Sequence, residues 1–299
     1  MLTAVYGLTG ALIFGAADFL GGLASKRISA IQATAVAAIT GLLALLLAYP
    51  FIGGEWSPDA VLWGVLSGVS GAIAISLLYA SLAIGPMSIL SPLTAVVSAV
   101  VPATVGLLGG DRLAPIGYWA LGLALVAVVL VGFVPERGAV RPSLVGVLMA
   151  IGSGVMIGAF IIMIDLTPND SGIVPLILNR AVNGGIMLCV IGILTLVAWR
   201  RRRRRSLRAQ ASPRSPEARA TLRAGLALAV GCGVVDVVAN FLLLLGIRAG
   251  ELSVLSVLTA MYPAGTILLA AVVLRERIAP VQWVGLALAL AAAAMLSLA

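Results

Sequence analysis

Ser88-Ile89-Leu90-Ser91-Pro92-Leu93-Thr94-Ala95 returns 165 positions later as Ser253-Val254-Leu255-Ser256-Val257-Leu258-Thr259-Ala260. At the same offset, Asp111-Arg112-Leu113-Ala114-Pro115 returns as Glu276-Arg277-Ile278-Ala279-Pro280, and Gly85 returns as Gly250. Matches that keep one fixed offset indicate that the chain contains two copies of a single structural unit.

The composition places both copies in a membrane. Hydrophobic residues make up 62% of the 299 residues and charged residues only 10%. A soluble domain of this length cannot bury so much apolar surface, so lipid must be the solvent for most of it. The sequence has no histidine, which argues against a zinc site and a Ser-His-Asp triad. Cys189 and Cys232 lie within apolar runs without paired spacing, so we expect no disulfide, metal or cofactor.

Ten apolar segments of roughly 20 residues predict transmembrane helices. They cover residues 3–24, 31–52, 60–84, 87–109 and 115–134, then 143–164, 173–199, 223–247, 251–274 and 279–298. The predicted fold is an all-α polytopic membrane protein, with five-helix repeats at 1–134 and 143–299 and a linker at 135–142. Because five is an odd number, the second repeat must cross the membrane in the opposite sense, which makes the repeats inverted.

Basic residues are distributed unevenly among the predicted loops. Sixteen of the 19 Lys and Arg residues follow odd-numbered helices, ten of them between Arg200 and Arg223. Only Arg112 and Arg248 follow even-numbered helices. The positive-inside rule therefore places the odd loops, including the basic loop 200–222, in the cytoplasm and both termini outside. Beside a span end, the run from Arg200 to Arg205 is interpreted as contacting anionic lipid headgroups, and no nucleic-acid binding is expected.

Short motifs within this arrangement point to a known family. They are Gly15-Ala16-Ala17-Asp18-Phe19 followed by Lys26-Arg27, Gly85-Pro86, and the Asp-Arg and Glu-Arg elements before Pro115 and Pro280. With these motifs distributed over ten predicted helices in two repeats, the chain resembles the EamA-type branch of the drug/metabolite transporter superfamily. The resemblance implies a multi-pass exporter of small organic solutes, such as amino acids or related metabolites, with a central cavity between the halves. It also implies the bacterial plasma (inner) membrane and, for several relatives, cytoplasmic termini, the reverse of what the charge count predicts.

Two acids lie within predicted spans, Asp18 in the first and Asp236 in the eighth. A carboxylate near mid-bilayer costs at least about 2.5–3.5 kcal/mol, so each must face protein or water. Each carboxylate either binds a substrate ammonium or carries a proton, or it is a structural group that accepts backbone hydrogen bonds near Gly15 or Gly233. Asn240 follows Asp236 by four positions on the same helix face. It either binds a zwitterion together with Asp236 or fixes the carboxyl group.

A polar cluster of Asn179, Arg180 and Asn183 lies in the seventh predicted helix. We interpret Arg180 as extending toward the preceding loop, where Asp165 and Asp170 offer partners. In the alternative interpretation, Arg180 lines a cavity and binds a substrate carboxylate through both of its terminal nitrogens.

Two tyrosines, Tyr79 and Tyr262, lie in the third and ninth predicted helices close to Gly or Pro. Tyrosine can line a polar cavity while offering an apolar ring face to a solute. It can equally anchor a helix at the membrane interface. For these two residues we favour cavity lining.

Prolines concentrate in the fourth and ninth predicted helices. Each removes a backbone donor and leaves a carbonyl free, so we expect both helices to bend and to act as gates. The gating candidates are Pro86, Pro92, Pro102 and Pro263. Four serines at matched positions either satisfy the freed carbonyls or contact substrate: Ser88, Ser91, Ser253 and Ser256.

These features together predict a carrier for a small-molecule substrate, working by alternating access between the halves, with proton coupling left open. No phosphate-binding Gly loop followed by Lys-Ser/Thr is present, so ATP-driven pumping finds no support. An intramembrane enzyme would need a nucleophile with a base, and the spans offer no histidine and no paired carboxylates at one depth. A non-transporting scaffold or partner subunit is the remaining alternative.

Overall fold

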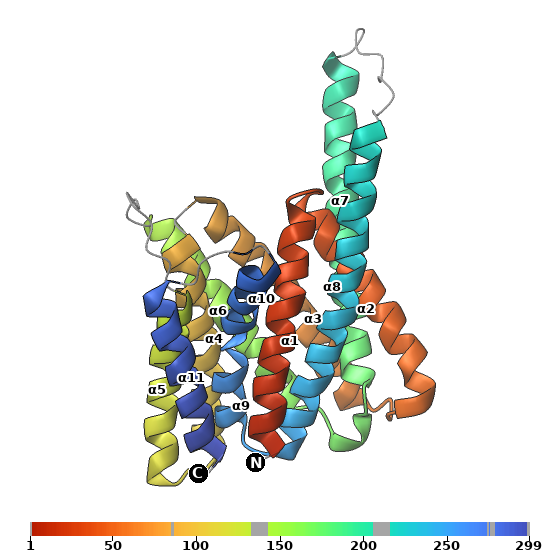
Figure 1. Ribbon diagram of the computed structural model, residues 1–299. Coiled ribbons are helices and arrows are strands. Elements are labelled where there is room, and N and C mark those ends of the chain that lie inside the picture. The colour runs from red at the N-terminus through yellow and green to blue at the C-terminus, as the bar shows by residue number, and fades with distance from the viewer. Residues whose placement is uncertain are drawn as a thin grey trace.

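The computed structural model describes residues 2–84, 87–132, 143–205, 216–273, 275 and 279–297. Within these ranges the chain is helical, without strands (Figure 1). The first half contains α1 (Leu2–Ser25), α2 (Ala30–Ile52), α3 (Pro58–Ile84), α4 (Met87–Gly109) and α5 (Pro115–Gly132). The second contains α6 (Leu144–Asp165), the 3-10 turn η1 (Asn169–Ser171), α7 (Val174–Arg205), α8 (Pro216–Ala249), α9 (Leu252–Thr259), α10 (Tyr262–Val273) and α11 (Pro280–Ser297). The predicted linker 135–142 lies outside the described residues.

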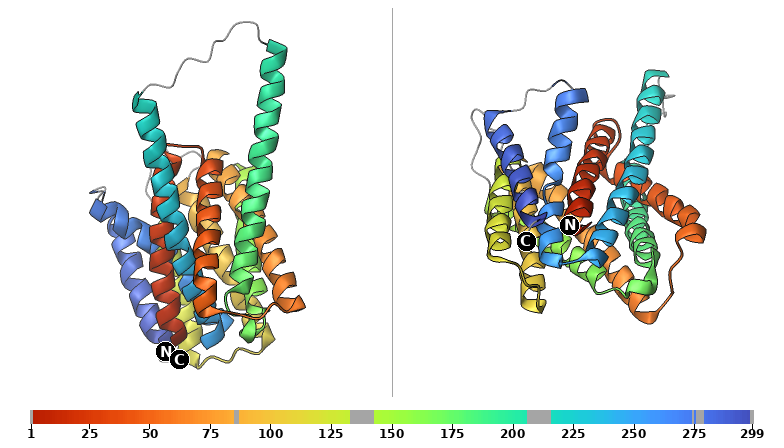
Figure 2. Two further views of the ribbon diagram at one scale, coloured as in Figure 1. Left: turned by 90° about the vertical axis from the view of Figure 1, so that its right-hand side faces the viewer. Right: turned by 60° about the horizontal axis from the view of Figure 1, so that its bottom comes forward.

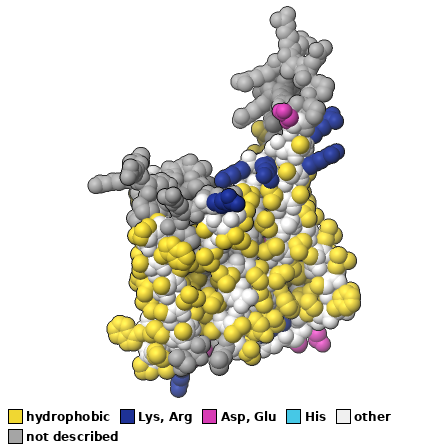
Figure 3. All heavy atoms as spheres, viewed as in Figure 1, with side chains coloured by type: hydrophobic (Ala, Val, Ile, Leu, Met, Phe, Trp, Pro, Cys, Tyr) yellow, Lys and Arg dark blue, Asp and Glu magenta, His cyan; other side chains and the backbone are white. Residues whose placement is uncertain are grey.

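The helices have the length and composition of membrane spans. Among the described residues, seven segments are long and apolar enough to cross a bilayer, and three shorter apolar helices lie in α4, α5 and α11. Hydrophobic side chains cover the visible flank of the bundle, and most visible Lys and Arg side chains gather at the end away from the termini (Figure 3). An apolar flank beneath a charged rim is the surface expected of a helical bundle in lipid. The predicted all-α polytopic fold is confirmed.

The packing of the helices repeats between the two halves. The contact between α1 and α8 has its counterpart in the contact between α6 and α3. In the same way, the contact between α2 and α8 corresponds to that between α7 and α3. α4 lies on α6 as α9 and α10 lie on α1. Equivalent helices also meet one another, namely α2 with α7, α4 with α9, and α5 with α11. α1 begins at the end of the bundle that carries both termini, whereas α6 begins at the opposite end (Figure 1). The halves are therefore related by an approximate twofold axis and inverted.

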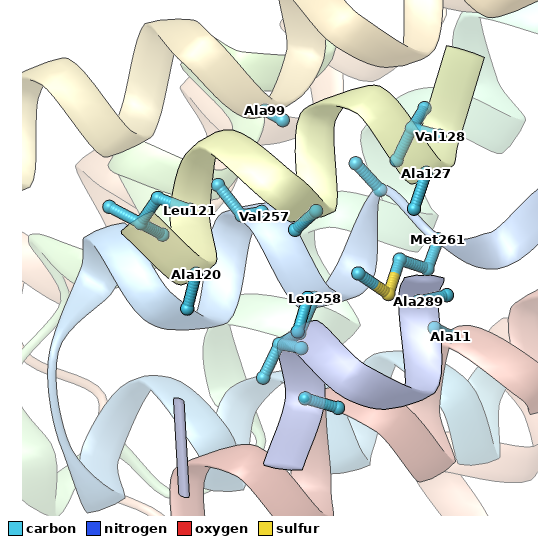
Figure 4. Close-up of a cluster of buried hydrophobic side chains, with 14 of the residues drawn as sticks. Ala11, Ala99, Ala120, Leu121, Ala127, Val128, Val257, Leu258, Met261 and Ala289 are labelled. Atoms are coloured by element: carbon cyan, nitrogen blue, oxygen red, sulfur yellow. The ribbon is translucent and has the colours of Figure 1, made fainter. Parts of the chain in front are cut away.

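Small side chains allow the halves to approach closely. The larger buried cluster takes residues from α1, α4, α5, α9 and α11, and many of them are alanines (Figure 4). Ala99, Ala120 and Ala127 are fully buried there, beside Val257 and Leu258 of α9. Because lipid is as apolar as a leucine side chain, helices in a membrane associate through close packing of small residues.

Two predicted boundaries were wrong. Residues 200–222 do not form a simple loop, because α7 continues to Arg205 and α8 begins at Pro216, so both helices extend beyond the bundle (Figure 2). Arginine is a good helix former and proline is favoured at the first helical position, which explains both ends. The ninth predicted helix is broken at Ala260 and Met261 into α9 and α10. α4, by contrast, is one helix that contains both Pro92 and Pro102.

The loops at the end that carries the termini are joined by hydrogen bonds. The backbone N–H of Glu55 donates to the carbonyl of Asp170 at 3.0 Å, and that of Ile173 donates to Gly53 at 3.2 Å. Arg248, at the end of α8, donates to the Gly172 carbonyl at 2.9 Å and to the Ser171 hydroxyl at 3.1 Å. These bonds fasten the α2–α3 loop, the α6–α7 loop and α8 to one another.

Candidate functional site

The crossing of α1 and α10 positions the first predicted site residue. A Cβ at Gly15 would collide with backbone atoms of Tyr262, Gly265 and Thr266, so only glycine allows this approach. The hydroxyl of Thr266 donates to the Gly15 carbonyl at 3.1 Å. Asp18 follows Gly15 by about one helical turn. The crossing therefore places Asp18 about one turn from the point at which α1 meets Tyr262 of α10.

Asp236 of α8 forms an ion pair with Arg180 of α7. The Asp236 side chain is 23% exposed and the Arg180 side chain 15% exposed. Two glycines allow the helices to pack closely here. Gly233 of α8 contacts the backbone of Ala37 in α2, and Gly41 of α2 lies beside the Arg180 side chain, since a Cβ at Gly41 would be 3.6 Å from Cδ of Arg180. The ion pair thus lies where α2, α7 and α8 meet.

The favoured interpretation of Arg180 was wrong. Its guanidinium group pairs with Asp236 on a neighbouring helix and does not extend to Asp165 or Asp170. Arg180 is fifteen positions from Asp165 in sequence and more than fifty from Asp236. Reasoning along the chain favoured the nearer acids, whereas the packing of α7 beside α8 supplied a partner inside the bundle.

Asp18 stands apart from this ion pair. Its side chain is exposed, and none of the described residues forms a hydrogen bond or ion pair with its carboxylate. Along the contact between α1 and α8, a Cβ at Gly21 would lie 3.3 Å from Sγ of Cys232 and a Cβ at Gly10 would lie 3.6 Å from Cβ of Leu242, so Asp18 lies at the level of Asp236. Three charged groups from α1, α7 and α8 therefore share one region of the bundle: two carboxylates and one guanidinium.

The three predicted amides differ in their surroundings. Asn179 donates through Nδ2 to the Ser67 hydroxyl of α3 at 3.1 Å, a bond that joins two helices. Asn240 donates through Nδ2 to the backbone carbonyl of Asp236 at 2.8 Å, within its own helix. Asn183 is only 6% exposed, and its Oδ1 accepts no hydrogen bond from the described residues. Two of the three amides thus bind the protein itself, while the third has an unused acceptor.

The serines of the second octet are fully buried and bonded to protein. The Asp111 carboxylate, just after α4, accepts the backbone N–H of Ser253 at 2.9 Å and its hydroxyl at 2.8 Å. Ser256 donates to the Ser253 carbonyl at 3.0 Å. The role of Asp111 was missed from the sequence. The internal repeat could have pointed to it, because the octet that contains Ser253 and the element that begins with Asp111 both recur at the same offset of 165 positions.

Several predicted residues cannot be placed in the site. Pro86 lies outside the described residues, as do the side chains of Tyr79, Ser88, Ser91 and Pro92. Pro102 is buried within α4, and Pro263 is buried at the second position of α10. A proline there forfeits no hydrogen bond because the first turn of a helix has no internal acceptors for its N–H groups. The ninth predicted helix is therefore interrupted just before Pro263, at the point where a bend was expected.

Comparisons with known proteins agree with this architecture. A solved structure described as "Crystal structure of protein" matches with a TM-score of 0.72, covering 99% of this chain and 98% of that chain at 18% sequence identity. At this identity the likeness concerns the fold alone. No curated protein matches the sequence. The sequence model of the EamA-like transporter family matches residues 144–298, which are the second repeat and more than half of the chain. With its inverted five-helix halves, this protein is an integral, multi-pass membrane protein that belongs to the EamA-like transporter family.

Proposed function

We propose that the protein carries small organic solutes, such as amino acids or related metabolites, out of the cell by alternating access between its two halves. The solute would bind beside Asp18, Arg180 and Asp236, with Tyr262 offering an apolar face. The observation that carries this proposal is the ion pair between Arg180 and Asp236, which stands beside a second, unpaired carboxylate. Ionisable groups inside a membrane are costly, and transporters use them for substrate or proton binding.

The depth of the site supports the same proposal. Along α8, Asp236 lies thirteen residues from the end at Ala249 and thirteen residues from Arg223, roughly 20 Å in each direction. Charged groups at this depth are far from either surface of a bilayer whose apolar core is about 30 Å thick. A site near the middle can open to each side in turn when the halves rock against one another. The break between α9 and α10, which lies where α1, α4 and α5 meet the second half, offers a place for that movement.

The distribution of charge favours one orientation. Because α7 ends and α8 begins opposite the termini (Figure 1), and ten arginines lie between Arg200 and Arg223, we propose that this end faces the cytoplasm. Protease digestion of right-side-out vesicles that carry a tag after the C-terminus tests this orientation. Loss of the tag on external digestion is expected, and its protection would reverse the orientation.

Counterflow in proteoliposomes tests the function. We expect purified wild-type protein to exchange labelled solutes from a panel of amino acids and amines, and Asp236→Asn to lose most of this exchange. Asparagine keeps the shape of the side chain and an oxygen for Arg180, so folding should survive. Asp59→Asn, which changes an exposed acid in the first turn of α3, is the matched control and should exchange normally. Full exchange by a folded Asp236→Asn protein would remove Asp236 from the mechanism.

A further inference from the structure

Asp18 is exposed although it lies at the level of Asp236, deep within the bundle. In an α-helix each residue points about 100° from the one before it. α8 meets α1 at Gly21, beside Cys232, and α10 meets α1 at Gly15. These two glycines point about 60° to either side of Asp18. The Asp18 side chain therefore faces the space between α8 and α10, inside the bundle.

The same side of α1 is covered nearer the termini. Gly7 and Ala11 point within about 20° of the direction of Asp18. A Cβ at Gly7 would lie 3.0 Å from Cβ of Leu258 in α9, and Ala11 belongs to the same buried cluster as Leu258. α9 is buried along its whole length, and Asp111 of the first half holds its first turn. Between Asp18 and the termini, this side of α1 is thus closed by α9.

Toward the other end of the bundle, this side of α1 is uncovered. Gly22 lies one turn beyond Asp18 and points about 40° from it. Gly22 is exposed, and a Cβ at this position would have no atom within 4 Å. Val5 is also exposed, but it points about 140° away from Asp18, outside the sector between α8 and α10. The exposure at Asp18 and Gly22 is therefore not that of the lipid-facing side of α1.

An exposed carboxylate at this depth requires water. Among the described residues, none forms a hydrogen bond or ion pair with Asp18. A charged side chain in a membrane faces protein partners or a water-filled space, because lipid solvates it poorly. We propose that a water-filled vestibule enters between α1, α8 and α10 from the end that carries the α7 and α8 extensions (Figure 2) and ends at Asp18.

The vestibule gives the structure a direction. It is open at the end opposite the termini and closed by α9 at the end that carries them, so a solute enters and leaves from one side only in this conformation. Its role as an entry path deepens the proposed function and rests on it. Asp18 is then the charged group that a solute meets before the ion pair of Arg180 and Asp236.

Labelling of single cysteines tests the vestibule without requiring transport. Both native cysteines are first replaced, as Cys189→Ser and Cys232→Ala. Gly22→Cys and Asp18→Cys then report on the vestibule, and Val5→Cys is the matched control, an exposed position on the lipid-facing side of the same helix. A charged, membrane-impermeant methanethiosulfonate is added to sealed inside-out and right-side-out vesicles. Arg219→Cys, an exposed position near the start of α8, marks the side that the reagent reaches.

We expect Gly22→Cys and Asp18→Cys to react from the same side as Arg219→Cys. Both should react at least about tenfold faster than Val5→Cys, because the reactive thiolate forms in water and not in lipid. Equal rates at Asp18→Cys and Val5→Cys, faster labelling from the side opposite to Arg219→Cys, or no labelling at both vestibule positions in folded protein would each overturn the proposal. Counterflow by the wild type is measured separately, so failure of the vestibule and failure of the proposed function are distinguishable.

Discussion

The carboxylate of Asp111, in the first half of the chain, accepts both the backbone N–H and the hydroxyl of Ser253, in the second half. Ser253 lies in the first turn of α9, whose capping residue, Glu251, makes no side-chain capping bond. A residue from the other half thus satisfies a free donor at the start of this helix, as a local capping residue would. The two halves are joined by this contact at the end of the bundle near the termini.

Replacing Asp111 should destabilise the protein. Asp111→Ala removes two charge-assisted hydrogen bonds and leaves buried donors on Ser253, so we expect a loss of about 1–2 kcal/mol in the free energy of unfolding. Thermal unfolding in detergent measures the change. Glu55→Gln, an exposed acid in the α2–α3 loop, is the control and should unfold like the wild type. An unchanged unfolding temperature for Asp111→Ala would show that the contact does not stabilise α9.

The ion pair between Arg180 and Asp236 should show strong coupling. Arg180→Met leaves Asp236 without its partner and should cost on the order of 2–3 kcal/mol. This is less than for fully buried pairs because both side chains retain some exposure. The double variant Arg180→Met/Asp236→Leu should recover most of that stability, since no uncompensated charge remains. Additive losses in the double-mutant cycle would show that the two side chains do not stabilise each other.

The crossing of α1 and α10 depends on Gly15. Gly15→Val places a branched side chain against the backbone of Tyr262 and Thr266, so the helices must separate. We expect a loss of at least about 2 kcal/mol in stability and of most counterflow activity, because overpacking against a rigid backbone cannot be relieved by rotamer changes. Gly22→Val, on the same helix, has open space around it and serves as the control. Equal stability of the two variants would contradict the close contact.

Stability should depend on pH through Glu251. Burial, and then the charge of Asp111, raise the pKa of the Glu251 carboxyl above its ordinary value of 4.5, although a backbone N–H of Arg112 opposes the shift. The folded state then binds this proton more tightly than the unfolded state, so the contribution of Glu251 to stability falls as pH rises above about 4.5.

Glu251→Gln should therefore unfold at a higher temperature than the wild type at neutral pH. The difference should shrink as the pH is lowered to about 4.5 and disappear below it. Unfolding temperatures measured in detergent across this range check the prediction. A gap between the two proteins that stays constant over the whole range would exclude titration of Glu251 as its cause.

The sequence by itself determined the class of the fold. The apolar runs fixed the helices because a backbone in lipid must satisfy its own hydrogen bonds. The repeat at one offset, with five spans per copy, implied inverted halves, and the packing of α1 on α8 and of α6 on α3 agrees. The motif around Asp18 and the Glu276-Arg277 element led to the family that the comparison of residues 144–298 shows. All of these features are local patterns or regular repeats, so no contact between distant residues had to be known.

Only the tertiary structure decided which side chains meet. Arg180 was assigned to nearby acids, yet its partner is Asp236 on the adjacent helix. Asp111 carried no predicted role, yet it binds Ser253 across the two halves. Helices that are apolar all round show no periodicity that marks their inner face, so the sequence cannot state how each one is rotated. That rotation is set by the close contact of small residues such as Gly15 and Gly233, which occurs only when the helices pack.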